Sequence, residues 1–204
     1  MNAATLSAIQ AAHAEVEAAK KKLAQTLRDA ASMTVPDVAL VATDGASIKL
    51  SDLFGEHSEL ILVHNMGKSC RWCTLWADGF RGYQNHLQSR AAFALVSPDA
   101  PEDARDFATS RNWNFPVVTY AGSGLAKTLG FEPEPGMYYP GFSALHKADD
   151  GTITRTGMSH FGPGDDYCAV WPFFDQLKDG QKGWEPQYAY GGGGGCCGGG
   201  GCCS

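Results

Sequence analysis

Ser69-Cys70-Arg71-Trp72-Cys73 is the stretch that decides the fold prediction. A short apolar run, Leu60 to Asn65, precedes it and predicts a buried strand. The residues that follow, Thr74 to Arg90, place large apolar side chains at helical spacing and predict a helix. The stretch therefore puts two cysteines, separated by two residues, where a strand gives way to a helix, a placement typical of redox-active pairs.

The position of the pair assigns different roles to its two cysteines. Cys70 lies at the expected helix N-terminus, where free backbone N–H groups and the helix dipole favour the thiolate. We expect Lys68 and Arg71 to add positive charge nearby. Cys73, one turn into the helix, is expected to be more buried and to resolve a mixed disulfide formed at Cys70.

A zinc site is the alternative interpretation of the same pair. Two cysteines supply half of a tetrahedral site, and two further ligands are needed. His57, His64 and Cys168 are available, but none forms a second paired motif near the first. The strand-to-helix context favours redox chemistry, with no metal and no other cofactor.

A long helix is predicted ahead of this region, over residues 3–31. Its apolar positions alternate in spacings of three and four, which indicates a heptad-like seam. Two interpretations fit: an amphipathic helix lying on the domain, or a coiled coil that joins two copies as a homodimer. The seam consists of Leu6, Ile9, His13, Val16, Lys20, Leu23, Leu27 and Ala30.

The order of elements predicts an α/β fold with a mixed central sheet flanked by helices. Alternating strands and helices imply a parallel sheet with right-handed crossovers. The turn Asp149-Asp150-Gly151 then closes an antiparallel hairpin, and residues 165–180 predict a last helix. This layout matches a thioredoxin-like fold of the peroxiredoxin-like branch, with an N-terminal helical extension. The other expected strands are 38–41, 48–50, 91–96, 115–120, 142–147 and 152–156, and the other expected helices are 51–55, 101–112 and 123–129.

Several motifs resemble a bacterial thioredoxin-like family of uncharacterised proteins, described as predicted dithiol-disulfide oxidoreductases. The resemblance covers residues 5–180 and implies a thioredoxin fold and a redox role for Cys70 and Cys73. The run from Trp76 to Phe80 is its most specific part. The motifs are Asp52-Leu53-Phe54, Cys70-x-x-Cys73-x-x-Trp76-Ala77-Asp78-Gly79-Phe80, Trp113-Asn114-Phe115-Pro116 and Gly141-Phe142-Ser143.

Three further residues gain a meaning from the expected fold. Pro140 precedes a closing strand, where thioredoxin-like folds place a cis-proline beside the cysteines; an ordinary trans proline is the alternative. Gly67 occupies the position at which peroxiredoxins carry a threonine, which disfavours a peroxidase. Asp78 is expected to be a solvated helix-face carboxylate, with a proton relay to Cys73 as the other interpretation.

The C-terminal residues 186–204 are predicted to be a flexible tail rich in glycine and cysteine. Glycine dominates its last fourteen residues, GGGGGCCGGGGCCS, which cannot form a core. Their four cysteines can enclose a soft metal ion or exchange electrons with Cys70 as a tethered dithiol. A tail with no fixed role is the third possibility.

Composition excludes several classes of function. A formal net charge of −6 argues against nucleic acid, and the apolar runs are too short to cross a membrane. The N-terminus lacks the pattern of a secretory signal, so we expect a cytoplasmic protein, in which close cysteines are catalytic or metal-binding more often than structural.

The sequence thus predicts an N-terminal amphipathic helix over residues 1–34, a thioredoxin-like domain over 35–185 and the tail over 186–204. The leading hypothesis is a thiol–disulfide oxidoreductase acting on a disulfide-containing protein or a small thiol substrate. Its predicted site residues are Cys70 as nucleophile, Cys73 as resolving cysteine and Pro140. A metal-binding or metal-sensing protein and a peroxiredoxin-like peroxidase are the alternatives.

Overall fold

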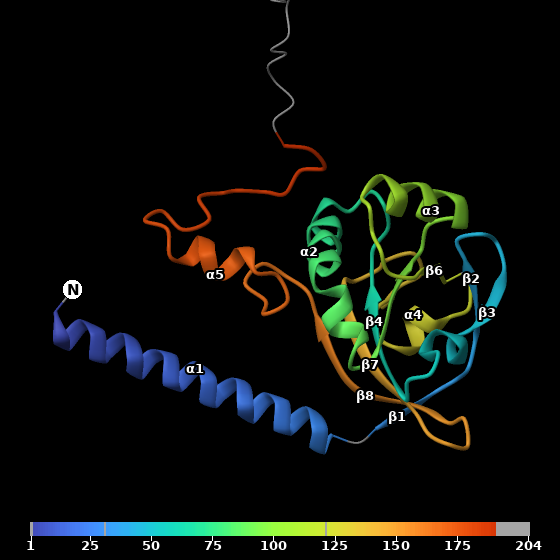
Figure 1. Cartoon of the computed structure of the whole chain (residues 1–204), viewed down its shortest axis with the longest axis horizontal. Coiled ribbons are helices and arrows are strands. Elements are labelled where there is room, and N and C mark those ends of the chain that lie inside the picture. Colours follow the sequence, from blue (N-terminus) through green and yellow to red (C-terminus); the bar gives the residue numbers. More distant parts are fainter. Residues whose placement is uncertain (1, 31, 121, 191–204) are drawn as a thin grey trace, which may run out of the picture.

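One eight-stranded mixed sheet organises the chain, in a computed structural model that describes residues 2–30, 32–120 and 122–190 (Figure 1). The strand order is β1-β8-β7-β4-β5-β6-β2-β3. The strands are β1 (Met33–Val35), β2 (Ala39–Ala42), β3 (Ser47–Lys49), β4 (Glu59–His64), β5 (Ala92–Ser97), β6 (Val117–Thr119), β7 (Gly141–Lys147) and β8 (Ile153–His160). The helices are α1 (Ala3–Asp29), the 3₁₀ helix η1 (Leu50–Phe54), α2 (Arg71–Gln88), α3 (Pro101–Ser110), α4 (Leu125–Thr128) and α5 (Val170–Asp175).

The pairing confirms the predicted mixed architecture. Strands β4, β5 and β6 run parallel and are joined through α2 and α3, whereas β7 and β8 form the antiparallel hairpin that closes the sheet. Strand β7 pairs with the whole of β4, from Glu59 opposite His146 to His64 opposite Gly141. The carboxyl end of β4 and the start of β7 therefore lie side by side at the same end of the strands, which is where the cysteine loop begins.

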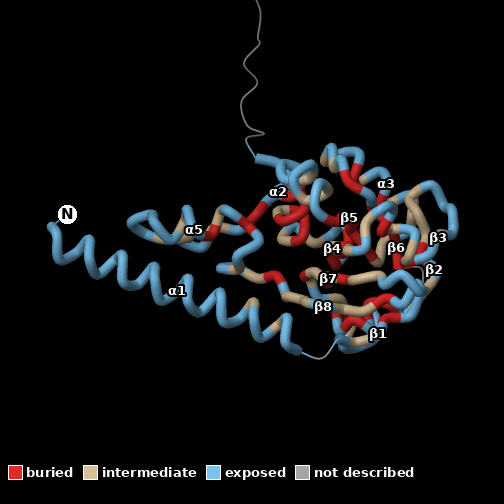
Figure 2. Tube along the Cα trace, turned by 60° about the horizontal axis from the view of Figure 1, so that its bottom comes forward, coloured by how far each residue is buried: buried red, intermediate tan, exposed pale blue. Residues whose placement is uncertain are grey.

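The two faces of the sheet carry separate hydrophobic cores. Alternate residues of β4 point to opposite faces, so Leu60 and Leu62 join the core beneath η1 and α4, while Val63 joins the core beneath α2 and α3. Figure 2 shows that buried residues are concentrated in the sheet and in the inner sides of these helices. Packing against this second core holds α2, and with it the cysteine pair, in a fixed position.

Helix α1 differs from the expectation that it lies on the domain. It has no buried residue, and its seam residues Leu6, Ile9, Val16 and Leu23 are exposed by 41–60%. The helix extends away from the sheet on the side where α5 also projects (Figures 1 and 2). Its one ion pair with the rest of the described chain joins Lys20 to Asp166, at 2.7 Å. A homodimer through this helix stays a prediction.

Three boundaries differ from those expected. Strand β1, which pairs with β8, begins at Met33 and so crosses the expected boundary between residues 34 and 35. The last helix is short, because Asp165 accepts the N–H groups of Tyr167 and Cys168 in a turn and the helix starts only at Val170. Residues 186–190, expected to belong to the tail, make contacts with the domain that are described below.

Candidate active site

Cys70 is the N-cap residue of α2. Its backbone is extended, and its Sγ accepts a hydrogen bond from the Cys73 N–H at 3.1 Å. The Cys70 N–H in turn donates to the Gly67 carbonyl at 3.0 Å, which closes the loop between β4 and α2. The sequence prediction that the helix N-terminus is aimed at this sulfur is therefore confirmed.

Gly67 shapes the loop in a way that only glycine permits. Its φ of +100° lies in the left-handed region, and a Cβ atom there would lie 2.8 Å from the Asp99 Oδ1. The Gly67 N–H donates to the Asn65 side chain at 2.7 Å, and the Lys68 N–H donates to the Asp99 Oδ2 at 2.7 Å. A threonine at position 67, where the peroxiredoxin pattern has one, would therefore need a strained backbone and a shift of the Asp99 carboxylate.

The pKa values of the two cysteine thiols are shifted in opposite directions. Hydrogen bonds from the Cys73 thiol, and then from the Cys73 and Trp72 N–H groups, lower the pKa of Cys70 to about 7 and outweigh its partial burial. The hydrogen bond to Cys70, followed by burial, raises the pKa of Cys73 well above its usual range. Cys73 is 3% exposed, whereas Cys70 is half-buried, and both are free thiols. The pair therefore combines an accessible thiolate with a buried thiol one helical turn away.

We expect the alkylation rate of Cys70 to rise about tenfold per pH unit up to pH 7 and to level off above it, because the thiolate is the reacting species. Iodoacetamide labelling of the reduced chain, quantified on the Cys70 peptide by mass spectrometry, measures this profile. Replacement of Cys73 by Ala removes the main hydrogen bond and should move the inflection upward, toward 9.0. An inflection that stays near pH 7 in this variant would contradict the assignment.

The positive charges expected beside Cys70 are already paired. Lys68 forms an ion pair with Asp103 at 2.7 Å, and Arg71 forms one with Glu185. Neither cation is among the causes of the lowered pKa of Cys70, which are hydrogen bonds within the motif. The low pKa of Cys70 is therefore attributed to hydrogen bonds within the motif, and the expected contribution of Lys68 and Arg71 stays a prediction. As matched controls for the labelling experiment, K68Q and R71Q should leave the inflection near pH 7.

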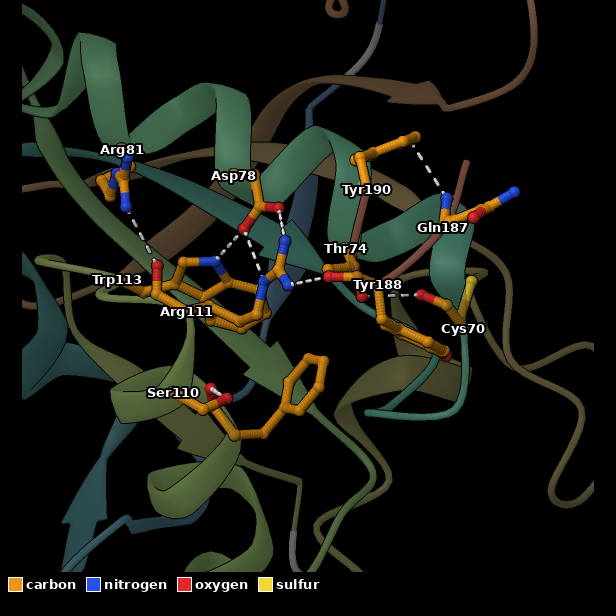
Figure 3. A network of polar contacts seen from close by, with 11 residues as sticks. Cys70, Thr74, Asp78, Arg81, Ser110, Arg111, Trp113, Gln187, Tyr188 and Tyr190 are labelled. Carbon is orange, nitrogen blue, oxygen red and sulfur yellow. Dashed lines mark hydrogen bonds and ion pairs between the residues drawn. The ribbon is translucent and has the colours of Figure 1, made fainter. Parts of the chain in front are cut away.

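The sequence reasoning missed a segment beside the site, residues 184–190, which we call the C-terminal strap. Its Glu185 pairs with Arg71, and the Tyr188 hydroxyl donates to the Lys68 carbonyl at 3.1 Å. Partial burial, and then the charge of the two cysteines, raises the pKa of Tyr188. Figure 3 shows Tyr188 beside Cys70 at the start of α2. The strap thus lies against the cysteine loop from a distant part of the chain.

Asp78 anchors this strap and is only partly exposed to solvent, by 32% of its side chain. It forms an ion pair with Arg111 and accepts a hydrogen bond from the Trp113 indole at 2.9 Å (Figure 3). Arg111 donates its Nη1 proton to the Tyr188 carbonyl at 2.5 Å. Asp78 therefore fixes Arg111, which holds the strap in place, and the described contacts give Asp78 no hydrogen bond to Cys73.

An aromatic cluster adjoins the pair on the α2 side. Trp76 is buried, stacks on Phe161 and donates its indole proton to Asp165 at 2.8 Å. Trp72, between the two cysteines, remains partly exposed and packs against Trp171 and Trp184. Most of the cluster is core, and Trp72 is its partly exposed member between the two cysteines.

Pro140 lies at the expected place but not in the cis form. It directly precedes β7, whose first residue, Gly141, pairs with His64 at the end of β4. None of the peptide bonds among the described residues is cis, so the bond before Pro140 is trans. Its carbonyl accepts the Phe161 N–H at 2.9 Å. Pro140 thus lies at the same end of the strands as the start of the cysteine loop.

His64, one of the alternative zinc ligands, is a buried structural group. Its Nδ1 lies 2.7 Å from the Tyr120 hydroxyl and its Nε2 lies 2.9 Å from the Ser143 hydroxyl. Burial lowers the pKa of His64 to about 3, so the ring is neutral and both nitrogens are satisfied. Within residues 2–190, gaps aside, no three histidine, cysteine or carboxylate side chains gather to hold a metal. The tail cysteines lie outside the described residues, and a metal site there stays a prediction.

None of the described helices combines the length and the apolar character needed to cross a membrane.

Solved structures with a similar fold include peroxiredoxins and a peroxiredoxin-like protein. They include peroxidoxin BcpB from Mycobacterium tuberculosis (TM-score 0.52, 20% identity, 63% of this chain and 84% of that one). Reduced Prx3 from Vibrio vulnificus in complex with H₂O₂ gives a TM-score of 0.52 at 15% identity, over 67% of this chain and 90% of that one. A peroxiredoxin-like protein from Aquifex aeolicus gives 0.51 at 13% identity, over 63% and 74%. The predicted thioredoxin-like fold of the peroxiredoxin-like branch is therefore confirmed.

Sequence comparisons assign the chain to a family. A search of curated proteins finds no match. A family model described as "Bacterial protein of unknown function (DUF899)" matches residues 4–189, which include nearly all of α1, the whole sheet and most of the strap. Because that match spans nearly all of the described residues, the chain belongs to this bacterial family of unknown function, DUF899.

Proposed function

We propose that this protein is a thiol–disulfide oxidoreductase in which Cys70 is the nucleophile and Cys73 the resolving cysteine. The observation that carries the proposal is the contrast within the pair. A half-buried thiolate with a pKa of about 7 caps α2, and a buried thiol with a raised pKa stands one turn behind it. Disulfide exchange needs an attacking thiolate and a second thiol that stays protonated until it resolves the mixed disulfide.

The first step is attack of the Cys70 thiolate on a substrate disulfide. A bond forms between the Cys70 sulfur and one substrate sulfur, the substrate S–S bond breaks, and the leaving sulfur departs as a thiolate that takes a proton from water. Half of the substrate is now reduced and the other half is held in a mixed disulfide. The partly exposed Trp72 lies beside this intermediate and offers it an apolar contact.

The second step uses the change in charge that the first step creates. The pKa of Cys73 is raised first by its hydrogen bond to Cys70 and also by the negative charge there. Formation of the mixed disulfide removes that charge, so the pKa of Cys73 falls and its thiol can release its proton. The Cys73 thiolate then attacks the Cys70 sulfur, forms the Cys70–Cys73 disulfide and expels the second substrate thiol. The substrate has gained two electrons and the pair has lost two.

We expect replacement of Cys73 by Ser to trap the mixed disulfide on Cys70, because the first step remains possible and the second does not. Incubation with an oxidised peptide disulfide, followed by peptide mass spectrometry under non-reducing conditions, measures the adduct. The matched control adds C168S to the C73S variant. Because Cys168 is a buried thiol in the core beneath α2, its loss should leave the amount of trapped adduct unchanged. An adduct on a residue other than Cys70, or none at all, would contradict the proposal.

A peroxiredoxin-like peroxidase is the competing proposal. The fold that this protein shares with the peroxiredoxins named above favours the peroxidase. The local geometry argues against it, because Gly67 stands where the peroxiredoxin pattern has a threonine, and its left-handed φ and the nearby Asp99 carboxylate disfavour a side chain there. Consumption of hydrogen peroxide and of an oxidised peptide disulfide by the same preparation compares the two; faster turnover of the peroxide would replace our proposal. A cytoplasmic location, in which thiols are kept reduced, fits a disulfide reductase.

A further inference from the structure

The C-terminal strap passes the start of α2 in the direction opposite to the cysteine motif. As the residue number in the strap rises from 184 to 188, the number of the residue that it contacts falls from 72 to 68. The two segments therefore lie antiparallel, and one register describes all of these contacts. The contacts join Trp184 to Trp72, Glu185 to Arg71 and the Tyr188 hydroxyl to the Lys68 carbonyl.

The same register places Pro186 level with Cys70. Pro186 directly follows Glu185, and Cys70 directly precedes its partner Arg71. Pro186 is buried, whereas the other strap residues are half-buried or exposed. Figure 3 shows the next anchor, Tyr188, beside Cys70. The strap thus crosses the surface from which a substrate reaches the half-buried thiolate.

The strap makes its contacts with groups that a separate peptide could also supply. Residues 184–187 belong to no helix or strand, and no backbone hydrogen bond among the described residues joins the strap to the cysteine loop. Its carboxylate reaches the exposed guanidinium of Arg71, and its phenol reaches a backbone carbonyl two residues before Cys70. The surface beside Cys70 therefore fits an extended chain with a negative charge directly before the residue that faces the sulfur.

We propose that the substrate is an extended peptide segment whose half-cystine follows an acidic residue, and that the C-terminal strap occupies its binding path in the free protein. The inference rests on the proposed function and names the substrate class of that site. In the bound substrate, the half-cystine takes the place of Pro186, and the acidic residue takes the place of Glu185 on Arg71. An aromatic residue two positions after the half-cystine takes the place of Tyr188.

The strap can give way because its bonds to the cysteine loop are few and exposed. The ion pair between Glu185 and Arg71 lies in solvent, where such pairs contribute little stability. The bond from Arg111 to the Tyr188 carbonyl also has to break. A substrate gains the mixed disulfide with Cys70, which the strap cannot form with a proline at that position. Trp184 can stay in place, since it also packs on Phe174 at 4.9 Å between ring centroids.

The first test weakens the strap in the full chain with E185Q and Y188F together. The substrate is the acetylated peptide Gly-Glu-Cys-Gln-Tyr, oxidised to its symmetrical disulfide. Because the strap and the peptide compete, the KM of the peptide should fall about tenfold. The kcat should stay within about twofold, since no reacting atom is changed. D179N with K182Q is the matched control: it removes an exposed ion pair outside the strap and should leave KM unchanged.

The second test exchanges charge at Arg71. The protein should reduce the Glu peptide with a kcat/KM about fivefold above that of the same peptide with Lys in place of Glu. R71E should reverse this preference and favour the Lys peptide. K68E is the matched control, because it changes the net charge equally, while the Lys68 side chain is bonded to Asp103 and makes no contact with the strap among the described contacts. This variant should keep the preference for the Glu peptide.

The inference is overturned if E185Q with Y188F leaves KM unchanged or raises it, or if R71E does not reverse the preference. Reduction of bis(2-hydroxyethyl) disulfide distinguishes this failure from failure of the proposed function, because that small substrate offers no peptide to the path. Absence of its reduction by the natural chain contradicts the proposed function. Normal reduction, together with peptide kinetics that ignore Arg71 and the strap, overturns the inference about the substrate alone.

Discussion

Replacement of Cys70 by Ser should lower the rate of disulfide reduction by at least about 10³-fold. The serine hydroxyl is not ionised at neutral pH, and it cannot form the S–S bond on which the exchange depends. Cys73 cannot take over the attack, because it is 3% exposed and lies behind the N-cap position. The loss should therefore appear with every disulfide substrate, large or small.

The measurement is turnover of an oxidised peptide with a chemical reductant in excess, followed by separation of the reduced product. Serine is nearly isosteric with cysteine and is itself a favoured N-cap residue, so α2 should keep its start and the variant its thermal stability. C168S again serves as the control that loses a thiol away from the reacting atoms. Activity of C70S at the wild-type rate would remove Cys70 from the mechanism.

Replacement of Gly141 by Ala should destabilise the fold by about 3 kcal/mol. A Cβ atom at this position would lie 2.2 Å from the Ser159 carbonyl oxygen, 2.5 Å from the Phe131 ring and 3.0 Å from the His160 Cα. Two of these neighbours are backbone atoms of the paired strand β8, which cannot move aside as the end of a side chain can. Relief of the clash has to separate β7 from β8.

This change should also reach the active site, since Gly141 pairs with His64 and the cysteine loop begins directly after that residue. Thermal unfolding followed by circular dichroism should show a fall in Tm of about 6–12 °C. G157A is the matched control on β8, because its Cβ would meet the Ala144 Cβ at an ordinary 3.6 Å. Equal Tm values for G141A and G157A would show that the sheet accommodates the methyl group.

The fold could be predicted from local patterns to a large extent. The strand before Cys70, the helix after Cys73 and the hairpin after Pro140 appear within a few residues of their expected bounds. Each depends on the spacing of apolar side chains or on turn residues close by in the chain. The short strand β1 was missed, because three residues show no period and the strand exists only through its pairing with β8.

The candidate site could be predicted only in part. The order of Cys70 and Cys73 at a helix start predicts an N-cap cysteine and a more buried one behind it, and the structure has this arrangement; their roles as nucleophile and resolving cysteine belong to the proposed function. The largest cause of the low pKa of Cys70, the hydrogen bond from the Cys73 thiol, was not expected, whereas the backbone N–H groups of the helix start contribute as predicted. Lys68 and Arg71 are paired with carboxylates that come from distant elements. Asp78 was assigned to solvent because its partners, Arg111 and Trp113, lie more than thirty residues away.

By itself, the sequence determined that a thiolate-bearing cysteine begins a helix behind a buried strand, since that arrangement depends on neighbours along the chain. Only the tertiary structure decided what surrounds the cysteine. The strap at residues 184–190 returns to the cysteine loop across 120 residues, as the bond from Tyr188 to Lys68 shows, and α1 extends from the sheet with its apolar seam exposed. The physical reason is that such contacts depend on which distant surfaces meet after the sheet has assembled. Hydrophobic periodicity predicts that one face of an element is buried, but it does not identify the residues that this face contacts.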